Sequence, residues 1–288
     1  RVRSSAASDV YKRQVIDSIA RNEMSNNPAP GKEYIGEEGF LHCGICGEPV
    51  QQYVEEMKNF LNGGIVPTQC RCMRVKSARL HEARKRSRAL EKITELQREG
   101  FSDPAYLKLT FDMDNGSSQN ARTISEWYIE NFSELKAQGK GLMFMGNTGT
   151  GKTFYACCIA NALIERGIAV WVTTVQPLLR KAGDFNRADE IFRKIQTVDL
   201  LILDDFGAMQ HSSRNLDLLF EVIDTRARSG LPLIITTNLS PAEFSSDSLE
   251  LQRIFSRVKG MCCSVHGSPV VMAGEDQRIK QVRLANDT

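Results

Sequence analysis

The sequence predicts an α/β fold in which helices flank a parallel sheet, preceded by a small zinc-binding N-terminal module. Residues 146–153 read GNTGTGKT and stand between a short apolar run and a helical pattern. Two later apolar runs, at residues 198–205 and 231–238, end in polar residues, as parallel strands do beside a ligand site. Two cysteine pairs with the spacing of metal ligands precede these segments.

Length and composition restrict the class of protein. The 288 residues are enough for a medium-sized domain and a smaller one, and the 41% hydrophobic fraction is enough for a core. The formal net charge of +2 does not by itself indicate a partner. No apolar run approaches the roughly 18 residues that a membrane helix needs, so we expect no membrane association. The eight cysteines lie in apolar segments or at metal spacing, and we therefore expect a reducing, cytoplasmic location.

The first 30 residues contribute little to this interpretation. Residues 1–14 have no clear period and begin with Arg1; we interpret them as a non-native remnant of sequence assembly, the alternative being a disordered tail. A short helix is expected over residues 15–24, followed by a linker rich in helix breakers at residues 26–31.

The cysteine pairs predict a structural metal site. Cys43 and Cys46 form a C-x-x-C pair, and Cys70 and Cys72 form a tighter C-x-C pair. Four thiolates would give a closed tetrahedral Zn²⁺ site, which stabilises a segment too small to bury much core. The residues between the pairs leave room for a hairpin or a short helix. His42 is an alternative ligand, and four free cysteines are the alternative to a metal site.

Residues 71–100 predict a basic helix. They contain ten Lys and Arg against four Glu, a net charge of +6, with a thin apolar stripe at helical spacing. A solvated helix and a helix that binds phosphates or a partner protein are both compatible with this pattern. A Gly-Phe-Ser-Asp-Pro break follows, so we divide the chain into an N-terminal region, residues 15–100, and a second domain, residues 101–288. Residues 121–138 are expected to form one amphipathic helix.

The glycine-rich segment matches the phosphate-binding loop G-x-x-x-x-G-K-T. Its candidate nucleotide-binding residues are Gly146, Asn147, Thr148, Gly149, Thr150, Gly151, Lys152 and Thr153. Backbone N–H groups of such a loop, with the N-terminus of the following helix, bind phosphate oxygens. Lys152 would reach the β- and γ-phosphates, and the Thr153 hydroxyl would bind Mg²⁺. A chance glycine turn before a helix is the alternative.

Three polar residues at the ends of expected strands complete this site. Asp204 and Asp205 end the apolar run that begins at residue 198, and Asn238 ends the next one. We expect Asp204 to bind Mg²⁺, directly or through water, and Asp205 to orient the attacking water. Asn238 fits a sensor of the γ-phosphate. The alternatives are a capped strand exit and a turn residue.

Two arginines lie on one face of a later helix. Arg253 and Arg257 are four residues apart, so they share that face. Such an arginine can reach a neighbouring subunit's γ-phosphate and neutralise charge that develops in the transition state. Arginines on a solvated surface are the alternative.

Together these motifs resemble a known family. Residues 111–278 are similar to AAA+ ATPases of the DnaC/DnaI type, the replicative helicase loaders, and to the related IstB transposition helpers. The resemblance is carried by residues 146–153, 200–205, 236–238 and 253–258, and by the pattern Gly274-x-x-x-Arg278.

The resemblance implies more than the residues do alone. It implies a RecA-like AAA+ fold, ATP hydrolysis with Mg²⁺, self-association into an ATP-bridged oligomer, binding of single-stranded DNA and delivery of a DnaB-type hexameric helicase. By position it implies that Arg257 is the preferred arginine finger, with Arg253 second. The cysteines and basic helix look like the helicase-docking part of the loaders, which favours a loader over an IstB-like helper.

Two further classes are less consistent with the sequence. A small-molecule kinase with this loop needs an arginine-bearing lid and an acceptor pocket, whereas this chain has paired aspartates and an Asn at a strand end. A module that uses ATP only for structure has no need of a residue such as Asp205. We therefore expect an ATPase in which hydrolysis acts as a release switch.

Overall fold

The structure is a computed structural model that describes residues 31–59, 62–208, 212–240, 242–243, 248–262, 269–274 and 276. The expected tail at residues 1–14, the expected helix at 15–24 and Arg278 lie outside these residues. By contacts the chain groups into two units, Arg1–Arg88 and Ala89–Thr288, which are described separately. The functional division at residue 100 stays a prediction.

The described part of the first unit is built from two small antiparallel ladders. The ladders pair β1 (Tyr34–Ile35) with β2 (Leu41–His42) and β3 (Gln51–Tyr53) with β4 (Ile65–Pro67), with the short 3-10 helices η1 (Glu55–Met57) and η2 (Asn62–Gly64) between β3 and β4. The space between the cysteine pairs therefore holds a hairpin. Its buried apolar residues are Cys43, Val50 and Cys70. So small a core contributes little stability without a further cross-link.

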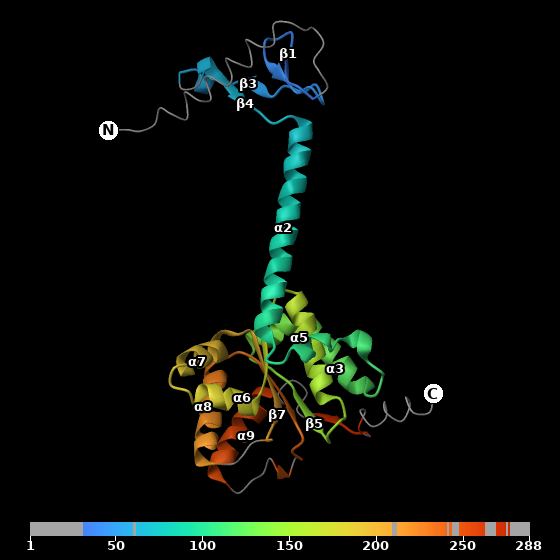
Figure 1. Ribbon diagram of the computed structural model, residues 1–288, viewed down its shortest axis with the longest axis vertical. Coiled ribbons are helices and arrows are strands. Elements are labelled where there is room, and N and C mark those ends of the chain that lie inside the picture. Colours follow the sequence, from blue (N-terminus) through green and yellow to red (C-terminus); the bar gives the residue numbers. More distant parts are fainter. Residues whose placement is uncertain are drawn as a thin grey trace, which may run out of the picture. The chain divides into compact units, whose positions relative to one another are not determined.

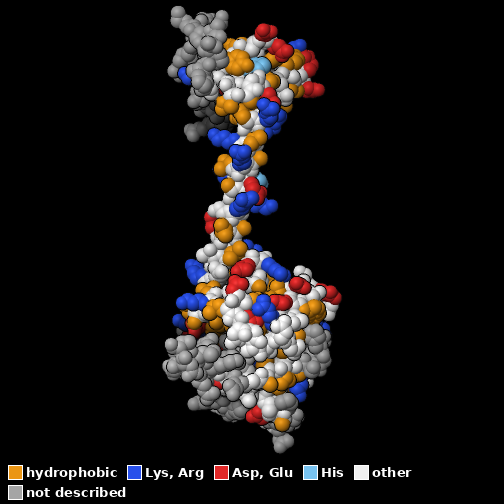
Figure 2. Space-filling model, turned by 90° about the vertical axis from the view of Figure 1, so that its right-hand side faces the viewer, with side chains coloured by type: hydrophobic (Ala, Val, Ile, Leu, Met, Phe, Trp, Pro, Cys, Tyr) orange, Lys and Arg blue, Asp and Glu red, His pale blue; other side chains and the backbone are white. Residues whose placement is uncertain are grey.

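The helix α2 (Arg71–Gly100) begins directly after Cys70. Lys and Arg side chains are visible along it in Figure 2, and Gly100 is its buried residue. Near its end, Ile93 and Leu96 are partly buried against the core of the second unit. The last turns of α2 thus belong to the packing of that unit, which is why the contacts divide the chain within the helix rather than at its end.

The second unit is an α/β domain (Figure 1). Its strands are β5 (Met143–Gly146), β6 (Val170–Thr174), β7 (Leu200–Phe206), β8 (Leu233–Thr237) and β9 (Val270–Met272). Its helices are η3 (Pro104–Lys108), η4 (Phe111–Met113), α3 (Gln119–Glu130), α4 (Phe132–Ala137), α5 (Lys152–Glu165), α6 (Val175–Ala182), α7 (Ala188–Thr197), α8 (Ser213–Ser229) and α9 (Leu249–Cys262).

The five strands form one parallel sheet in the order β6-β7-β8-β5-β9. This confirms the predicted fold class. The strands β7, β8 and β5 are neighbours, so their carboxyl ends meet at one edge of the sheet, where ligands bind in open α/β folds. The last strand of the sheet, β9, follows residues 263–268, which lie outside the described part.

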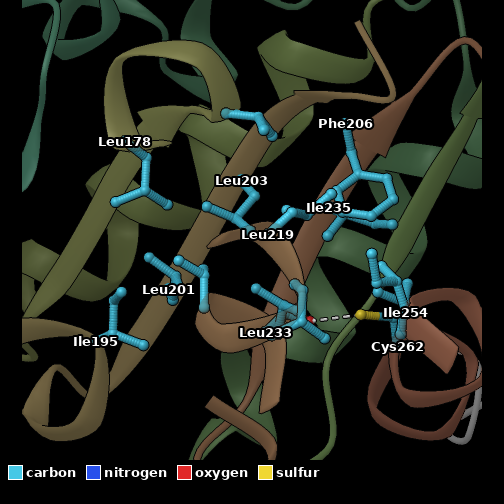
Figure 3. Packing of buried hydrophobic residues seen from close by; sticks show 14 of the residues in the cluster. Leu178, Ile195, Leu201, Leu203, Phe206, Leu219, Leu233, Ile235, Ile254 and Cys262 are labelled. Atoms are coloured by element: carbon cyan, nitrogen blue, oxygen red, sulfur yellow. Dashed lines mark hydrogen bonds between the residues drawn. The ribbon is translucent and has the colours of Figure 1, made fainter. Parts of the chain in front are cut away.

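Helices cover both faces of the sheet because its strands are apolar on both faces. Along β7, Leu201 and Leu203 face α6, α7, α8 and α9, whereas Leu200 and Ile202 face the side covered by α3, α4 and α5. Figure 3 shows the first of these layers, in which the Cys262 thiol donates a hydrogen bond to the Leu233 carbonyl at 3.1 Å.

One expected helix is divided. Residues 121–138 form α3 and α4, separated at Asn131. The Asn131 side-chain amide donates to the carbonyl of Trp127 at 2.8 Å, and its backbone N–H donates to the same carbonyl at 3.0 Å. An Asn side chain that competes for a helical carbonyl favours the end of a helix.

A buried arginine joins the elements at the edge of the sheet opposite the strands' carboxyl ends. Arg226 in α8 is fully buried, and its guanidinium donates to the carbonyls of Ile195 at 2.7 Å, Val198 at 2.8 Å and Pro232 at 2.6 Å, with a longer bond to Asp199. Burial lowers the pKa of Arg226 to about 10, which still leaves it charged at neutral pH. These bonds fix the segments that lead into β7 and β8.

Among the described residues, no helix combines the length and apolar character that crossing a bilayer requires.

Candidate nucleotide-binding site

The glycine-rich loop joins β5 to α5. The strand ends at Gly146 and the helix begins at Lys152, with Gly151 at the N-cap in a left-handed conformation at φ 96°. A Cβ atom on Gly146 would lie 2.1 Å from the carbonyl oxygen of Met272, so no larger residue fits there without a shift of the backbone. The loop is thereby held against β9, at the N-terminus of a helix that favours anions.

Lys152 lies across this loop. Its side chain is almost fully buried, and Nζ donates to the carbonyls of Gly146 at 2.9 Å and Asn147 at 2.6 Å. A cation held by carbonyl oxygens beside a helix N-terminus can exchange those partners for the oxygens of a phosphate.

Asp204 lies at the carboxyl end of β7 and is 2% exposed. Its Oδ1 accepts hydrogen bonds from the hydroxyls of Thr153 at 2.8 Å and Thr236 at 2.5 Å. Its Oδ2 accepts from the hydroxyl of Tyr106 at 3.0 Å. Hydroxyl donors compensate a carboxylate for the water it has lost. The contact with Thr153 links the end of β7 to the glycine-rich loop.

Asp205 is the penultimate residue of β7, and Asn238 directly follows β8. Asp205 has φ 55°, a left-handed value, and its backbone N–H donates to the Thr236 hydroxyl at 3.0 Å. The register between β7 and β8 shifts between Leu203 and Phe206, so the strand is distorted around Asp205. Distorted backbone of this kind is concentrated at functional sites.

These elements surround a cavity of about 460 Å³, within the range of roughly 300–1,000 Å³ that ligand pockets have. Its lining residues are Ala105, Tyr106, Leu109, Met113, Asp114, Asn115, Ser117, Thr148, Gly149, Gly151, Lys152, Thr153, Phe154, Asp205 and Asn238. The structure thus brings Lys152, Thr153, Asp205 and Asn238 to one cavity, with Asp204 directly behind Thr153. Their individual roles stay predictions.

The sequence did not indicate that residues 104–117 form one wall of this cavity. Within this wall, the Asp114 side chain is 1% exposed and accepts hydrogen bonds from the Arg122 guanidinium at 3.2 Å and the Tyr155 hydroxyl at 3.0 Å. Burial, followed by the hydrogen bond to Asp114, raises the pKa of Tyr155 to about 12. The segment has no period or motif that would have identified Tyr106 or Asp114, whereas Thr236 stands within the strand-end pattern that the sequence did reveal.

The two candidate finger arginines do not line the cavity. Arg257 donates through Nε to Asp224 in α8 at 2.9 Å, and its guanidinium lies 4.6 Å from the centre of the Phe220 ring. Arg228 forms a second ion pair with Asp224 at 2.5 Å, and Arg253 is exposed. An arginine that acts on a neighbouring subunit's nucleotide lies away from its own, so the finger role stays a prediction.

The four candidate metal ligands lie together in the first unit. The Sγ atoms of Cys43, Cys46, Cys70 and Cys72 are all within 4.8 Å of one another. Zn–S bonds of about 2.3 Å place tetrahedral sulfur ligands about 3.8 Å apart, so the cluster fits a zinc ion with little adjustment. His42, the alternative ligand, is not in the cluster and its Nδ1 lies 2.8 Å from the carbonyl oxygen of Gly47.

Backbone donors prepare two of these thiols for metal binding. Hydrogen bonds from the backbone at Cys72 and then at Glu48 lower the pKa of Cys46 to about 6, and those at Cys46 and Ile45 lower the pKa of Cys43. The thiolate is the metal-binding form of cysteine. The donor set therefore suits a thiophilic cation such as Zn²⁺.

Comparison with known proteins places these features in context. A family model described as "IstB-like ATP binding protein" matches residues 79–281. The chain is 28% identical over 145 residues to the replicative helicase loader DnaC of Escherichia coli (strain K12), covering 49% of this chain and 57% of that protein. It is 26% identical over 165 residues to the replicative helicase loader DnaI of Bacillus subtilis (strain 168), covering 52% of this chain and 51% of that one.

An insertion-sequence protein is similar at the same identity as DnaC and over more residues. The putative ATP-binding protein of insertion sequence IS5376 from Geobacillus stearothermophilus is 28% identical over 185 residues, covering 62% of this chain and 70% of that protein. The chain therefore spans little more than half the length of the loaders that it matches. Among solved structures, that of DnaI aligns with a TM-score of 0.53 at 23% identity, over 64% of this chain and 99% of that one. At this identity the likeness concerns the fold.

Proposed function

Because the chain belongs to the IstB-like ATP-binding protein family, we propose that it is an AAA+ ATPase that loads a DnaB-type hexameric helicase onto single-stranded DNA. The proposal depends above all on the buried Asp204, which is hydrogen-bonded to Thr153 at the start of α5 and lies behind the cavity that Lys152 lines. This is the arrangement that nucleoside triphosphate hydrolysis with Mg²⁺ requires.

Each residue of the site has a role in this proposal. The loop N–H groups and the N-terminus of α5 bind the phosphates, and Lys152 leaves its two carbonyl partners for a phosphate oxygen. Bound Mg²⁺ would neutralise phosphate charge, held by Thr153 and Asp204. Asp205 orients the attacking water, directly or through a second water, and Asn238 contacts the γ-phosphate. Hydrolysis then releases the loader from its complex.

The cysteine cluster is assigned a structural Zn²⁺ ion. Four sulfur ligands leave no open position for catalysis, and the ladders around them have little core of their own. We expect about one zinc ion per chain by elemental analysis of purified protein. The C70S/C72S variant should lose that zinc, whereas C158A, which changes a buried cysteine of the second unit, should keep it. Full zinc content in C70S/C72S would contradict the assignment.

The N-terminal unit favours a loader over a transposition helper. The residues before 79 lie outside the family match and hold the cysteine cluster and the start of the basic helix. We expect the full chain to capture a purified hexameric DnaB-type helicase, and C70S/C72S to lose that capture while it still binds ATP. If the chain binds no such helicase but stimulates a transposase, the IstB-like helper is the better assignment.

ATP turnover tests the enzyme class itself. We expect the wild-type chain to hydrolyse ATP with Mg²⁺ and to turn over faster with single-stranded DNA. Binding of ATP without hydrolysis, with or without DNA, would leave a nucleotide-binding module and exclude the release switch.

A further inference from the structure

Tyr106 is a residue of the cavity wall that the roles above do not use. It lies in η3, half-buried, and its hydroxyl donates to Oδ2 of Asp204 at 3.0 Å. It comes from a segment nearly a hundred residues away from Asp204 in the chain, so this contact depends on how residues 104–109 pack against the site.

The two oxygens of Asp204 are held differently. Oδ1 accepts from both Thr153 and Thr236. Among the described residues, Tyr106 is the donor to Oδ2. Without this hydroxyl, the carboxylate keeps its hydrogen bonds at Oδ1 but can rotate about them, so the direction of Oδ2 is no longer fixed. The orientation of a metal-binding or water-binding carboxylate is normally set by such outer hydrogen bonds.

The segment that carries Tyr106 is itself fixed to α5. Asp103 caps η3 by accepting a hydrogen bond from the N–H of Ala105 at 2.9 Å. The Asn161 side chain, on α5, donates to the carbonyls of Tyr106 and Leu109, both at 2.9 Å. Because α5 also carries Lys152 and Thr153, Tyr106 and the loop residues are held by one helix.

The contact of Tyr106 with Asp204 joins a phenol O–H donor to a carboxylate oxygen. A hydrogen bond to a carboxylate is charge-assisted and stronger than one between neutral groups.

We propose that Tyr106 is a positioning residue of the magnesium site, whose hydroxyl holds Oδ2 of Asp204 in the direction from which it receives Mg²⁺ or a Mg²⁺-bound water. This inference rests on the proposed function, because it requires that the cavity binds a nucleotide with Mg²⁺. It assigns to residues 104–109 a role in metal binding in addition to lining the cavity.

The test measures how much Mg²⁺ strengthens ATP binding. Isothermal titration calorimetry gives the Kd of ATP in EDTA and in MgCl₂, and the ratio of the two values reports the metal site without any need for turnover. In Y106F, which keeps the ring, we expect the Kd in EDTA to stay within about twofold of wild type. The ratio should fall about tenfold, the lower end of the effect of losing an outer hydrogen bond to a metal ligand.

A matched control changes a hydroxyl that contacts the same wall. Y155F removes the hydroxyl that donates to Asp114 and should leave the ratio unchanged, since Asp114 does not contact Asp204. N161A loosens the segment of Tyr106 but keeps its hydroxyl, and a smaller fall in the ratio is expected. If thermal unfolding shows that Y106F does not fold, the Kd ratio of N161A tests the proposal instead. An unchanged ratio in N161A would then contradict the role of Tyr106.

The outcomes separate the two proposals. If wild-type protein binds no ATP, the proposed function fails. If wild type shows a clear Mg²⁺-dependent gain and Y106F keeps that gain, only the role of Tyr106 is wrong. A larger gain in Y106F would mean that the hydroxyl competes with the metal, which also overturns a positioning role.

Discussion

At the scale of single residues, Asp204 shows how a carboxyl group is accommodated in a buried position. It is 2% exposed, yet three hydroxyl groups donate to its two oxygens. A buried polar group without partners would be costly, and these three hydrogen bonds offset that cost. They also hold both oxygens of Asp204 in place next to Thr153.

The D204N variant should separate binding from hydrolysis. An amide has one acceptor oxygen and no charge, so it cannot retain all three hydroxyl donors or attract a cation. We expect ATP binding in EDTA to persist and ATP turnover to fall by about 100-fold or more. Turnover is measured by phosphate release. The matched change D217N, at an exposed position of α8, should retain wild-type turnover; equal losses in both variants would contradict a specific role for Asp204.

Arg226, in contrast to Asp204, is important for the stability of the fold. Replacing it with Met in R226M leaves buried carbonyls at Ile195, Val198 and Pro232 without the donors they now have. We expect a loss of about 3–5 kcal/mol in the free energy of unfolding, measured by urea denaturation. R228M changes a mostly exposed arginine on the same helix and should stay within about 0.5 kcal/mol of wild type. A stability of R226M equal to that of R228M would show that those carbonyls find other donors.

Motifs decided which of these residues could be predicted. Lys152, Thr153 and Asp204 belong to patterns whose spacing follows from phosphate chemistry, so the sequence indicated them and the structure brings them together. Tyr106 reaches the site only through tertiary packing of a segment without any period. An arginine in a helix is usually exposed, and the sequence around Arg226 does not indicate that this one is buried.

At the scale of elements, α2 combines two environments in one helix. Residues 71–88 contain eight Lys and Arg with Glu82 as the sole acidic residue, and their side chains are largely exposed. The ion pairs of this segment join Arg71 and Arg74 to Glu48 and Arg86 to Glu82, which leaves most of its positive charge unpaired among the described residues. Exposed charge of this density attracts phosphate groups.

Neutralising part of α2 should weaken binding to single-stranded DNA. In K76Q/R79Q/R84Q/K85Q we expect the slope of log K against log salt to become shallower by about 3, since each contact with a single strand contributes about 0.7. Fluorescence anisotropy of a labelled oligonucleotide at several salt concentrations measures this slope. K76R/R79K/R84K/K85R keeps the charge and should keep the slope. If the neutralised variant binds DNA as wild type does but no longer captures the helicase, α2 is a protein-docking helix.

The elements differ in how well their sequence predicted them. The apolar runs at residues 198–205 and 231–238 form β7 and β8, as expected, although β7 continues one residue past Asp205 to Phe206. The helix at residues 121–138 was expected to be continuous, but the local hydrogen bonds of Asn131 divide it. A hydrophobic period does not reveal such a break, because α3 and α4 both keep apolar residues against the same core.

At the scale of the whole molecule, the order of the strands could not be obtained from periodicity. Buried parallel strands are apolar on both faces, so the sequence of β5, β7 or β8 does not identify its neighbours. The order β6-β7-β8-β5-β9 was accessible only through resemblance to a family. The same limit applies to Arg257 of α9, whose partner within one copy is Asp224.

Mixed oligomers test whether the nucleotide site is shared between copies. R257A lacks the arginine and K152A lacks the loop lysine, so each variant alone should hydrolyse ATP at least about 100-fold more slowly than wild type. Each variant retains the residue that the other lacks. Mixed together, a K152A neighbour can supply Arg257 to an R257A site, and part of the turnover should return. The measurement is phosphate release from equal mixtures at fixed total protein.

A second result would contradict the shared site directly. If R253A/R257A keeps full DNA-dependent turnover, no arginine of α9 acts on a nucleotide. R187A, which changes an exposed arginine of the same unit, is the control and should retain wild-type turnover alone and in mixtures.

The end of α2 has a practical consequence for dissecting and recombining this chain. Ile93 and Leu96 pack on the core of the second unit, Lys194 donates to the carbonyl of Glu99 at 2.9 Å, and Phe101 bridges to Val172 of β6. A fragment that starts at residue 101 would therefore lose part of its own packing, whereas one that starts at Ala89 would keep it. Chimaeras that exchange N-terminal regions with a relative should be joined in mid-helix at Arg88, in helical register, rather than at the glycine that ends the helix.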